Sequence, residues 1–412
     1  MNVNLVAAEN VAAVQLMLDG RPLPELNARP WKAAVDLGPQ LAPHELVAVA
    51  FDAKGNEIGR VRQWINRPRA EAEAFFVLDA GKGGTGRTAR LTWQTAGFEE
   101  PVSTAVLFDG QPLAVKDPKR IEIPAFVPER LHFLRAELGF PHGVNAVAEV
   151  TLGGSHRDEA LTNLTAVPIL VEPGAKAPGL DALASAFVRD AVPLSAVALE
   201  EGPADVVFVL TEGAALELQR IQSLEGRTPL STRSRLKKGQ SFRLVGAVPV
   251  TTSAGPMLLN TFPMSEDVTK TPEGIVHVLA HGTGFSANAA PLLGNAVAVA
   301  AISATARDRR RAVVLLLGAE KDDESPLEPK NVRGLLRHLR VPFFVWSLTT
   351  ESTPVAREWG RAEDASTSSL FETAVSSLSK VLDRQRIVWV EGTHLPQQIE
   401  LAASVKGFRL AQ

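Results

Sequence analysis

The stretch AFFVLDAGKGGTGRTARLTWQ, residues 74–94, decides between a nucleotide-binding fold and a β-sheet protein. Its glycine-rich centre, residues 81–88, nearly matches the phosphate-binding loop G-x-x-x-x-G-K-[ST], with Arg87 in place of the lysine. Such a loop needs a helix directly after it, because helix amides and the helix dipole face the phosphates. The residues after Thr88 instead alternate between small or apolar and polar, which indicates a strand. We therefore predict a glycine-rich β-turn, with a nucleotide site of Lys82, Arg87 and Thr88 as the alternative.

The sequence around this stretch contains an internal repeat. DGRPL at 19–23 matches DGQPL at 109–113, and WKAAVDLG and HELVAVAFD, from residues 31 and 44, have counterparts in KRIEIPAF and RLHFLRAEL, from residues 119 and 130. Asp-Gly pairs between apolar strands predict tight hairpin turns, because glycine accepts positive φ. Short, closely spaced strands predict immunoglobulin-like β-sandwiches, one at residues 1–68 and one at 72–171, joined by the linker NRPRAE.

The pattern changes after the second predicted linker, the Pro-, Gly- and Ala-rich segment 172–179. Nearly continuous apolar runs are typical of strands buried on both faces of a parallel sheet, and they occur here at 204–210, 241–250, 311–319, 341–348 and 386–390. Helical patterns lie between them, at 214–224, 287–307, 329–339 and 369–383. This alternation predicts a doubly wound, Rossmann-type α/β domain at residues 180–412.

Composition limits the classes of partner and location. The 412 residues carry a net charge of -3, so no global electrostatic attraction favours nucleic acid or an anionic membrane. The chain has no cysteine, which excludes disulfides and thiolate chemistry. No apolar run approaches the ~20 residues of a membrane span, so we expect no membrane insertion. The first residues lack the basic and apolar regions of a signal peptide, which leaves two alternatives: a cytoplasmic protein, or one whose leader has been removed.

The C-terminal region, from about residue 193 to 392, resembles a von Willebrand factor A domain. ADVVFVLTEGAALELQRI looks like the first strand and helix of that fold, and ARDRRRAVVLLLGAEKDDES like its fourth strand and following loop. LRVPFFVWSL looks like the next strand, and SLFETAVSSLSKVLDRQRIVWV like the last helix and strand. The whole arrangement is similar to the VWFA-related proteins of acidobacteria and their relatives. This resemblance implies protein binding and export to the periplasm or cell exterior.

The resemblance also implies a position for a metal site, D-x-S-x-S after the first strand, where oxygen ligands suit Mg²⁺. The aspartate falls on Thr211, the two serines on Gly213 and Ala215, and a later aspartate near Ala319. Gly213 and Ala215 offer no side-chain oxygen, so we expect a degenerate site with no metal and no other cofactor. A weak cation site formed by Thr211, Glu212 and the acidic residues 320–324 is the alternative to a solvated acidic loop.

Three further motifs have structural interpretations. In HVLAH, His277 and His281 are spaced as on one helix face, but Val278 replaces the glutamate of a zincin, which favours a surface or capping pair. The basic residues of 227–243 suggest a solvated loop, with a contact patch for an acidic partner as the alternative. ARDRRR, residues 306–311, is expected to end a helix, where cations favour the negative dipole end. ARDRRR contains no aromatic residue and 227–243 contains one, Phe242, so neither basic run has the repeated aromatic residues typical of nucleic-acid binding.

These observations predict a non-catalytic protein–protein interaction or scaffolding protein. No G-x-S-x-G motif occurs, and we assign no catalytic residue. Open α/β sheets bind ligands at the carboxyl ends of their strands, so we predict a partner-binding surface at Thr211, Glu212, Gly213, Glu320 and Asp322. A divalent-cation-dependent adhesion domain and a P-loop nucleotide hydrolase are the alternatives. The sequence leaves the protein partner and the oligomeric state open.

Overall fold

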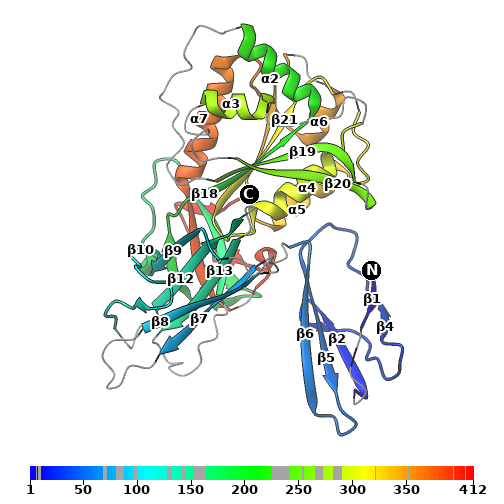
Figure 1. The fold of residues 1–412 in the computed structure, drawn as a ribbon, viewed down its shortest axis with the longest axis vertical. Helices are drawn as coiled ribbons and strands as arrows, with labels where there is room; N and C mark the ends of the chain where they lie inside the picture. Colours follow the sequence, from blue (N-terminus) through cyan, green and yellow to red (C-terminus); the bar gives the residue numbers. More distant parts are fainter. Residues whose placement is uncertain are drawn as a thin grey trace.

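The computed structural model describes residues 1–5, 7, 11–67, 72–79, 88–95, 100–127, 132–141, 145–152, 164–224, 241–252, 255–264, 272–281, 290–320, 322–350, 353–392, 394–403 and 405–412. Figure 1 shows two β units and a sheet with helices on both faces.

The first β unit consists of two small sheets around a shared core (Figure 1). One sheet has the order β3 (Arg21–Pro22), β2 (Ala13–Leu18), β5 (His44–Phe51), β6 (Glu57–Ile65). In the other, β1 (Asn2–Asn4) pairs with β4 (Lys32–Ala34). Val14 of β2 and Trp31, directly before β4, are buried between them. Burial alternates along the first residues of β2, so that Val14 and Leu16 point into the protein from one face of the strand.

The second β unit is a sandwich of two sheets. Its larger sheet has the order β10 (Gln111–Leu113), β9 (Ser103–Phe108), β12 (His132–Gly139), β13 (Asn145–Leu152), and its smaller sheet the order β11 (Ile121–Glu122), β8 (Thr88–Thr95), β7 (Ala72–Asp79). Leu91 of the smaller sheet and Leu134 of the larger belong to one apolar core. Strand β8 begins at Thr88, which confirms that a strand follows the glycine-rich segment. Residues 80–87, including Lys82 and Arg87, lie outside the described residues.

The two units repeat one turn in detail, which confirms the duplication. The φ angles are 52° at Asp19 and 49° at Asp109, and each is followed by a glycine of positive φ, as a type I′ turn requires. Asp19 Oδ2 lies 2.8 Å from His44 Nδ1, and Asp109 Oδ2 lies 2.7 Å from His132 Nδ1. The counterpart of His44 is therefore His132, and the predicted match to Arg130 is wrong by two residues, because the segment from Asp109 to the histidine is shorter by two residues than that from Asp19, whereas the predicted match required it to be shorter by four.

A separate antiparallel region joins the middle of the chain to its end. One sheet has the order β17 (Ala196–Glu200), β24 (Gln385–Glu391), β14 (Leu164–Val171), β26 (Phe408–Leu410), and a smaller one the order β16 (Val192–Leu194), β15 (Phe187–Arg189), β25 (Glu400–Leu401). Helix α1 (Leu180–Leu183) and the 3-10 helix η2 (Pro396–Gln398) complete it. Val167 and Val388 share a core with Phe187 of the smaller sheet.

This region corrects two sequence predictions. Strand β14 was expected to end the sandwich of residues 72–171, but it pairs with β24 from Leu164 to Leu170, so segment 172–179 is a connection within the antiparallel region. Strand β24 was expected in the parallel sheet of residues 180–412, but it belongs to this antiparallel one. The physical reason is that both strands are buried almost throughout. Such burial produces continuous apolar runs whichever way the neighbouring strands point.

A six-stranded sheet of order β20 (Gly255–Met264), β19 (Ser241–Thr252), β18 (Ala204–Leu210), β21 (Arg310–Leu317), β22 (Phe343–Ser347), β23 (Glu363–Asp364) forms the rest of the chain. All neighbours are parallel except β19 and β20. Val206 and Phe208 point to the face covered by α2 (Glu212–Leu224), α3 (Pro272–His281) and α7 (Ser368–Arg384). Val207 and Val209 point to the face covered by α4 (Leu293–Ala304), α5 (Pro329–His338) and α6 (Pro354–Trp359).

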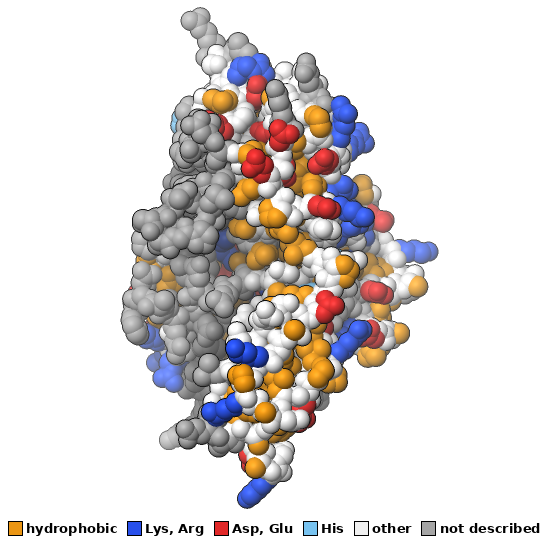
Figure 2. Space-filling model, turned by 90° about the vertical axis from the view of Figure 1, so that its right-hand side faces the viewer, with side chains coloured by type: hydrophobic (Ala, Val, Ile, Leu, Met, Phe, Trp, Pro, Cys, Tyr) orange, Lys and Arg blue, Asp and Glu red, His pale blue; other side chains and the backbone are white. Residues whose placement is uncertain are grey.

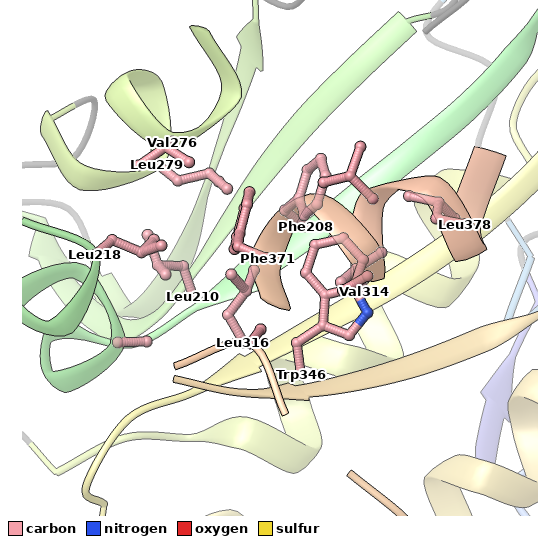
Figure 3. Packing of buried hydrophobic residues seen from close by; sticks show 14 of the residues in the cluster. Phe208, Leu210, Leu218, Val276, Leu279, Val314, Leu316, Trp346, Phe371 and Leu378 are labelled. Carbon is pink, nitrogen blue, oxygen red and sulfur yellow. The ribbon is translucent and has the colours of Figure 1, made fainter. Parts of the chain in front are cut away.

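Large rings fill the core beneath α7 (Figure 3). Trp346 of β22 lies 6.1 Å from Phe208 of β18 and 5.5 Å from Phe371 of α7, measured between ring centroids, and the Phe371 contact is edge-on. Such geometry suits the positive edge and negative face of aromatic rings. Trp346 is thus a core residue, as predicted, and it fixes α7 against the sheet.

Candidate functional site

The carboxyl end of the parallel sheet brings Thr211 and Glu320 together. Strands β18 and β21 are parallel neighbours, so the residues that follow them meet at one edge. The Thr211 hydroxyl donates to Glu320 Oε1 and accepts a hydrogen bond of 3.0 Å from the amide of Ala214. Thr211 therefore caps the first turn of α2 and holds the Glu320 carboxyl group at the positive end of this helix.

Two glycines permit this close approach. A Cβ atom on Gly213 would lie 2.8 Å from Glu320 Oε1, and one on Gly318 would lie 2.5 Å from the backbone carbon of Gly213. Side chains at these positions would push the segment after β21 away from α2. The local contact therefore depends on glycine at both positions.

The Glu320 side chain occupies the space above Thr211. Burial raises the pKa of Glu320, while the hydrogen bond from Thr211 acts in the opposite direction. Its Oε2 atom is buried without a hydrogen-bond partner among the described groups. Across the described residues, no group of three or more histidine, aspartate or glutamate side chains is placed to hold a metal ion. The hydroxyl of Thr211, where the resemblance implies a metal-binding aspartate, is already engaged by Glu320.

The acidic segment after Glu320 caps a helix. Asp323 Oδ1 accepts from the amide of Leu293 at 3.0 Å, and the Ser325 hydroxyl accepts from the amide of Gly294 at 2.7 Å. These bonds satisfy amides in the first turn of α4, whose own N-cap residue makes no such bond. Asp322 is exposed. The predicted solvated loop is therefore wrong for Asp323, whose carboxylate is used by the fold, and the structure does not bring Asp322 into contact with Thr211.

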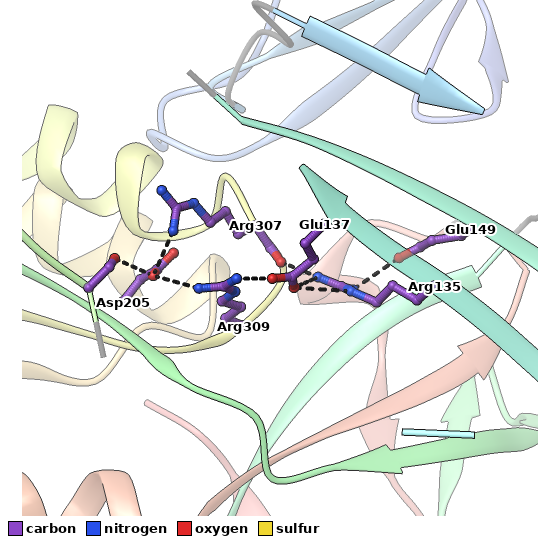
Figure 4. Close-up of polar contacts among 7 residues, drawn as sticks. Arg135, Glu137, Glu149, Asp205, Arg307 and Arg309 are labelled. Atoms are coloured by element: carbon purple, nitrogen blue, oxygen red, sulfur yellow. Dashed lines mark hydrogen bonds and ion pairs between the residues drawn. The ribbon is translucent and has the colours of Figure 1, made fainter. Parts of the chain in front are cut away.

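A buried group of charges lies at the opposite, amino end of the parallel sheet. We call the side chains of Arg135, Glu137, Glu149, Asp205, Arg307, Arg309 and Arg310 the arginine cluster; Figure 4 labels all of them except Arg310. Arg135 of β12 is 0% exposed. It donates to Glu137 at 2.8 Å, to Glu149 at 3.0 Å and to the carbonyl of Arg307. Its guanidinium carbon lies 4.5 Å from the ring centroid of Trp389 on β24. One side chain thus contacts the second β unit, the antiparallel sheet and the turn before β21.

Arg309 and Arg310 extend the cluster. Arg309 donates to Glu137 and lies 3.8 Å from Asp205 on β18. Arg310 donates to the carbonyl of Gly202 at 2.6 Å and to that of Leu382, near the end of α7, at 2.7 Å. The turn between α4 and β21 therefore joins elements from three distant parts of the chain.

This role was missed by the sequence analysis. The run ARDRRR was expected to end a helix, but α4 ends at Ala304, and the arginines form the following turn and the start of β21. The available signal was their position directly before an apolar strand that is buried at every residue. Cations there cannot all reach water, so they require partners within the protein.

Desolvation dominates the electrostatics of the cluster. Burial raises the pKa of Glu149 to about 8, although Arg135 favours its charged form. Burial and the nearby Arg135 lower the pKa of Arg309 to about 10. Charges in such a site stabilise the fold only while they remain paired, and removal of one partner is strongly unfavourable. The cluster therefore acts as a specific junction between the second β unit and the parallel sheet.

The other motifs from the sequence analysis lie neither at the carboxyl end of the parallel sheet nor in the arginine cluster. His277 lies exposed on α3, a helix as its spacing suggested, and the side chain of His281 lies outside the described residues. The basic segment 227–240 is also outside them, while Arg243 of β19 donates to the Ser303 hydroxyl at 2.9 Å.

The surface in Figure 2 mixes acidic, basic and hydrophobic side chains over the upper part of the molecule, and hydrophobic side chains are more frequent over the lower part. Charges of both signs fit the small net charge of -3. No helix within the described ranges has the length and apolar character needed to cross a membrane.

No protein-family model and no curated protein sequence matches the chain. Among solved structures, the chain is similar to fibronectin(III)-like modules of Clostridium thermocellum CbhA, at 14% identity and a TM-score of 0.16, over 39% of this chain and 88% of that one. It is similar to the fibronectin-III array of RIM-binding protein at 10% identity and a TM-score of 0.19, over 44% and 73%. It is similar to a bacterial ice-binding adhesin at 11% identity and a TM-score of 0.17, over 44% of this chain and 70% of that one. These scores are too low to establish a shared fold for the whole chain.

Proposed function

We propose that the protein is a non-catalytic scaffold that binds another protein, built from immunoglobulin-like β-sandwich units fixed to a metal-free, von Willebrand factor A-like α/β unit. The arginine cluster is the observation that carries this proposal. Flexible linkers allow modules to move independently, whereas this chain joins its second β unit to the parallel sheet through the ion pair of Arg309 with Glu137 and the hydrogen bond from Arg135 to the carbonyl of Arg307. Buried ion pairs contribute specific geometry more than net stability, and fixed geometry is what a scaffold requires.

The surface proposed for the partner is the carboxyl end of the parallel sheet, at Thr211, Glu212, Gly213, Glu320 and Asp322. The arginine cluster occupies the amino end of the same sheet, so the carboxyl end faces away from the second β unit (Figure 1). Asp322 is exposed there and Glu212 is half-buried. The Glu320 carboxyl group fills the position at the start of α2, which supports contact by a protein surface rather than through a bound cation.

The direct test uses the immobilised full chain to capture proteins from the source organism, with identification by mass spectrometry. The variant Glu212→Arg with Asp322→Arg reverses two charges at the proposed surface. Glu25→Arg with Glu122→Arg is the matched control, because both residues are exposed and lie on the β units. We expect a partner that the wild type and control retain and that the surface variant loses by about tenfold or more, an effect of about 1.4 kcal/mol. Equal recovery on all three proteins would contradict the proposed surface.

Two measurements separate this function from its alternatives. Calorimetry with Mg²⁺ or Ca²⁺ would support a cation-dependent adhesion domain if stoichiometric binding occurred and was abolished by Glu320→Ala and Asp322→Ala. A rise in melting temperature with excess ATP-Mg would support nucleotide binding by Lys82, Arg87 and Thr88. Export to the periplasm or cell exterior suits the proposed function, and a signal peptide encoded upstream in the gene would support it.

A further inference from the structure

A small cavity of about 50 Å³ lies where the first β unit meets the rest of the chain. Its lining includes Arg67, two residues after the end of β6, and Asp308 and Arg311, on either side of the start of β21. Thr165 of β14 and His394, after β24, also line it. The cavity is distinct from the proposed partner-binding surface, because β21 begins here and reaches that surface only at its other end.

Arg311 is the unusual member of this lining. Its side chain is 1% exposed, and its Nε and Nη1 atoms are buried without a hydrogen-bond partner in the described part of the chain. Its backbone amide donates to Gln385 Oε1 at 2.6 Å. The guanidinium groups of Arg309 and Arg310, by contrast, each donate to a neighbour. A buried cation with unsatisfied donors is strongly unfavourable unless another group enters the cavity and accepts from it.

Two other polar side chains that line the cavity, those of His394 and Thr165, are bonded elsewhere and do not accept from Arg311. His394 Nε2 lies 2.9 Å from the carbonyl of Glu391, and His394 Nδ1 lies 3.0 Å from Nη1 of Arg189. The Thr165 hydroxyl donates to the carbonyl of Gly392 at 2.7 Å and accepts from the His394 amide at 2.8 Å. Both side chains are therefore already engaged by partners within the antiparallel region.

The described residues that line the cavity carry more positive than negative charge. Arg67 lies with its guanidinium carbon 4.7 Å from the Trp64 ring centroid and faces the same cavity as Arg311. These two cations repel one another. Among the described residues that line the cavity, Asp308 supplies the one carboxylate against them, and Asp205 of β18 also favours the charged form of Arg311. An ordered water would satisfy a donor of Arg311 and leave this excess, whereas an anion would satisfy the donor and remove the excess.

We propose that the cavity binds one small monovalent anion of about chloride size between Arg311 and Arg67. The volume of about 50 Å³ accommodates one or two species of the size of water, whose share of liquid volume is about 30 Å³. This size excludes nucleotides and sugar phosphates. Because Arg67 follows the last strand of the first β unit and Arg311 lies on the parallel sheet, the anion joins these two parts of the chain.

The test compares chloride with gluconate, an anion too large for the cavity, on the whole 412-residue chain at constant ionic strength. The thermal unfolding midpoint should rise with the logarithm of chloride concentration, because a ligand of the folded state stabilises it by mass action. Arg67→Gln should weaken the fitted affinity by about tenfold, as expected for loss of about 1.4 kcal/mol. Arg311→Met should remove the chloride effect. Arg62→Gln is the matched control: Arg62 also lies over Trp64, at 5.7 Å, but does not line the cavity.

Identical midpoints in chloride and gluconate would show that the cavity holds water only and would overturn the proposal. An equal loss in Arg62→Gln and Arg67→Gln would do the same, because it would place the chloride effect outside the cavity. If Arg311→Met does not fold, the comparison of Arg67→Gln with Arg62→Gln still decides, together with ³⁵Cl line broadening of the wild-type protein. Broadening that Arg67→Gln reduces would support the site, and absence of broadening would contradict it.

Discussion

Replacement of Arg135 with methionine tests whether the arginine cluster holds the second β unit on the parallel sheet. The side chain is 0% exposed and donates to Glu137, to Glu149 and to the carbonyl of Arg307. Methionine retains apolar contact with Trp389 but leaves those acceptors without this donor. Breaking a buried ion pair costs about 3–5 kcal/mol. Glu137 keeps Arg309 as a partner, and Glu149, with its pKa raised to about 8, takes up a proton readily. We therefore expect a loss at the lower end of this range, about 3 kcal/mol in the free energy of unfolding.

Urea denaturation of the full chain, followed by tryptophan fluorescence and circular dichroism, measures this change in the free energy of unfolding. Arg62→Met is the control, because Arg62 pairs with Glu45 at 2.7 Å while its side chain is 50% exposed. Exposed pairs contribute about 0–1 kcal/mol. A loss of less than 1 kcal/mol for Arg135→Met, similar to that of the control, would refute the role of the cluster.

Two further predictions concern titration and close packing. Because the pKa of Glu149 is about 8 in the folded protein against an ordinary 4.5, the stability from its protonated form is complete below pH 4.5 and is lost as pH rises to about 8. The difference in unfolding free energy between wild type and Glu149→Gln should therefore change by up to about 1.4 kcal/mol per pH unit in this window, as measured by urea denaturation. A difference that stays constant with pH would contradict the raised pKa of Glu149. Gly318→Ala should destabilise by about 1–3 kcal/mol, because its Cβ would lie 2.5 Å from the backbone of Gly213. Gly334→Ala on α5, with no atom within 4 Å of its Cβ, should stabilise by about 0.5–1 kcal/mol, and equal thermal shifts for the two variants would argue against the packing described.

Local patterns in the sequence predicted individual elements well. The alternation after Thr88 predicted strand β8, and the helical pattern at 369–383 predicted α7 to within a residue at each end. The repeated Asp-Gly pairs predicted the turns of both β units, because the conformation they require is encoded within two residues.

Long-range pairing was not available from the same patterns. Strand β14 pairs with β24 more than two hundred residues away, and neither strand carries a local mark of its partner or direction. The arginine cluster was missed for the same reason, since the partners of Arg309 lie on β12 and β18. The position of Glu320 above Thr211 depends on which strands are neighbours, which is a property of the sheet.

The most direct test of the central claim, that the arginine cluster joins the second β unit and the parallel sheet into one body, is native-state amide hydrogen exchange followed by mass spectrometry. We predict that peptides from β12 and β21 exchange through openings of the same free energy in the wild type, and that Arg135→Met lowers both. Cooperative units of a protein exchange together in this way. Exchange of β12 at a lower free energy than β21 in the wild type, unaffected by Arg135→Met, would contradict the claim.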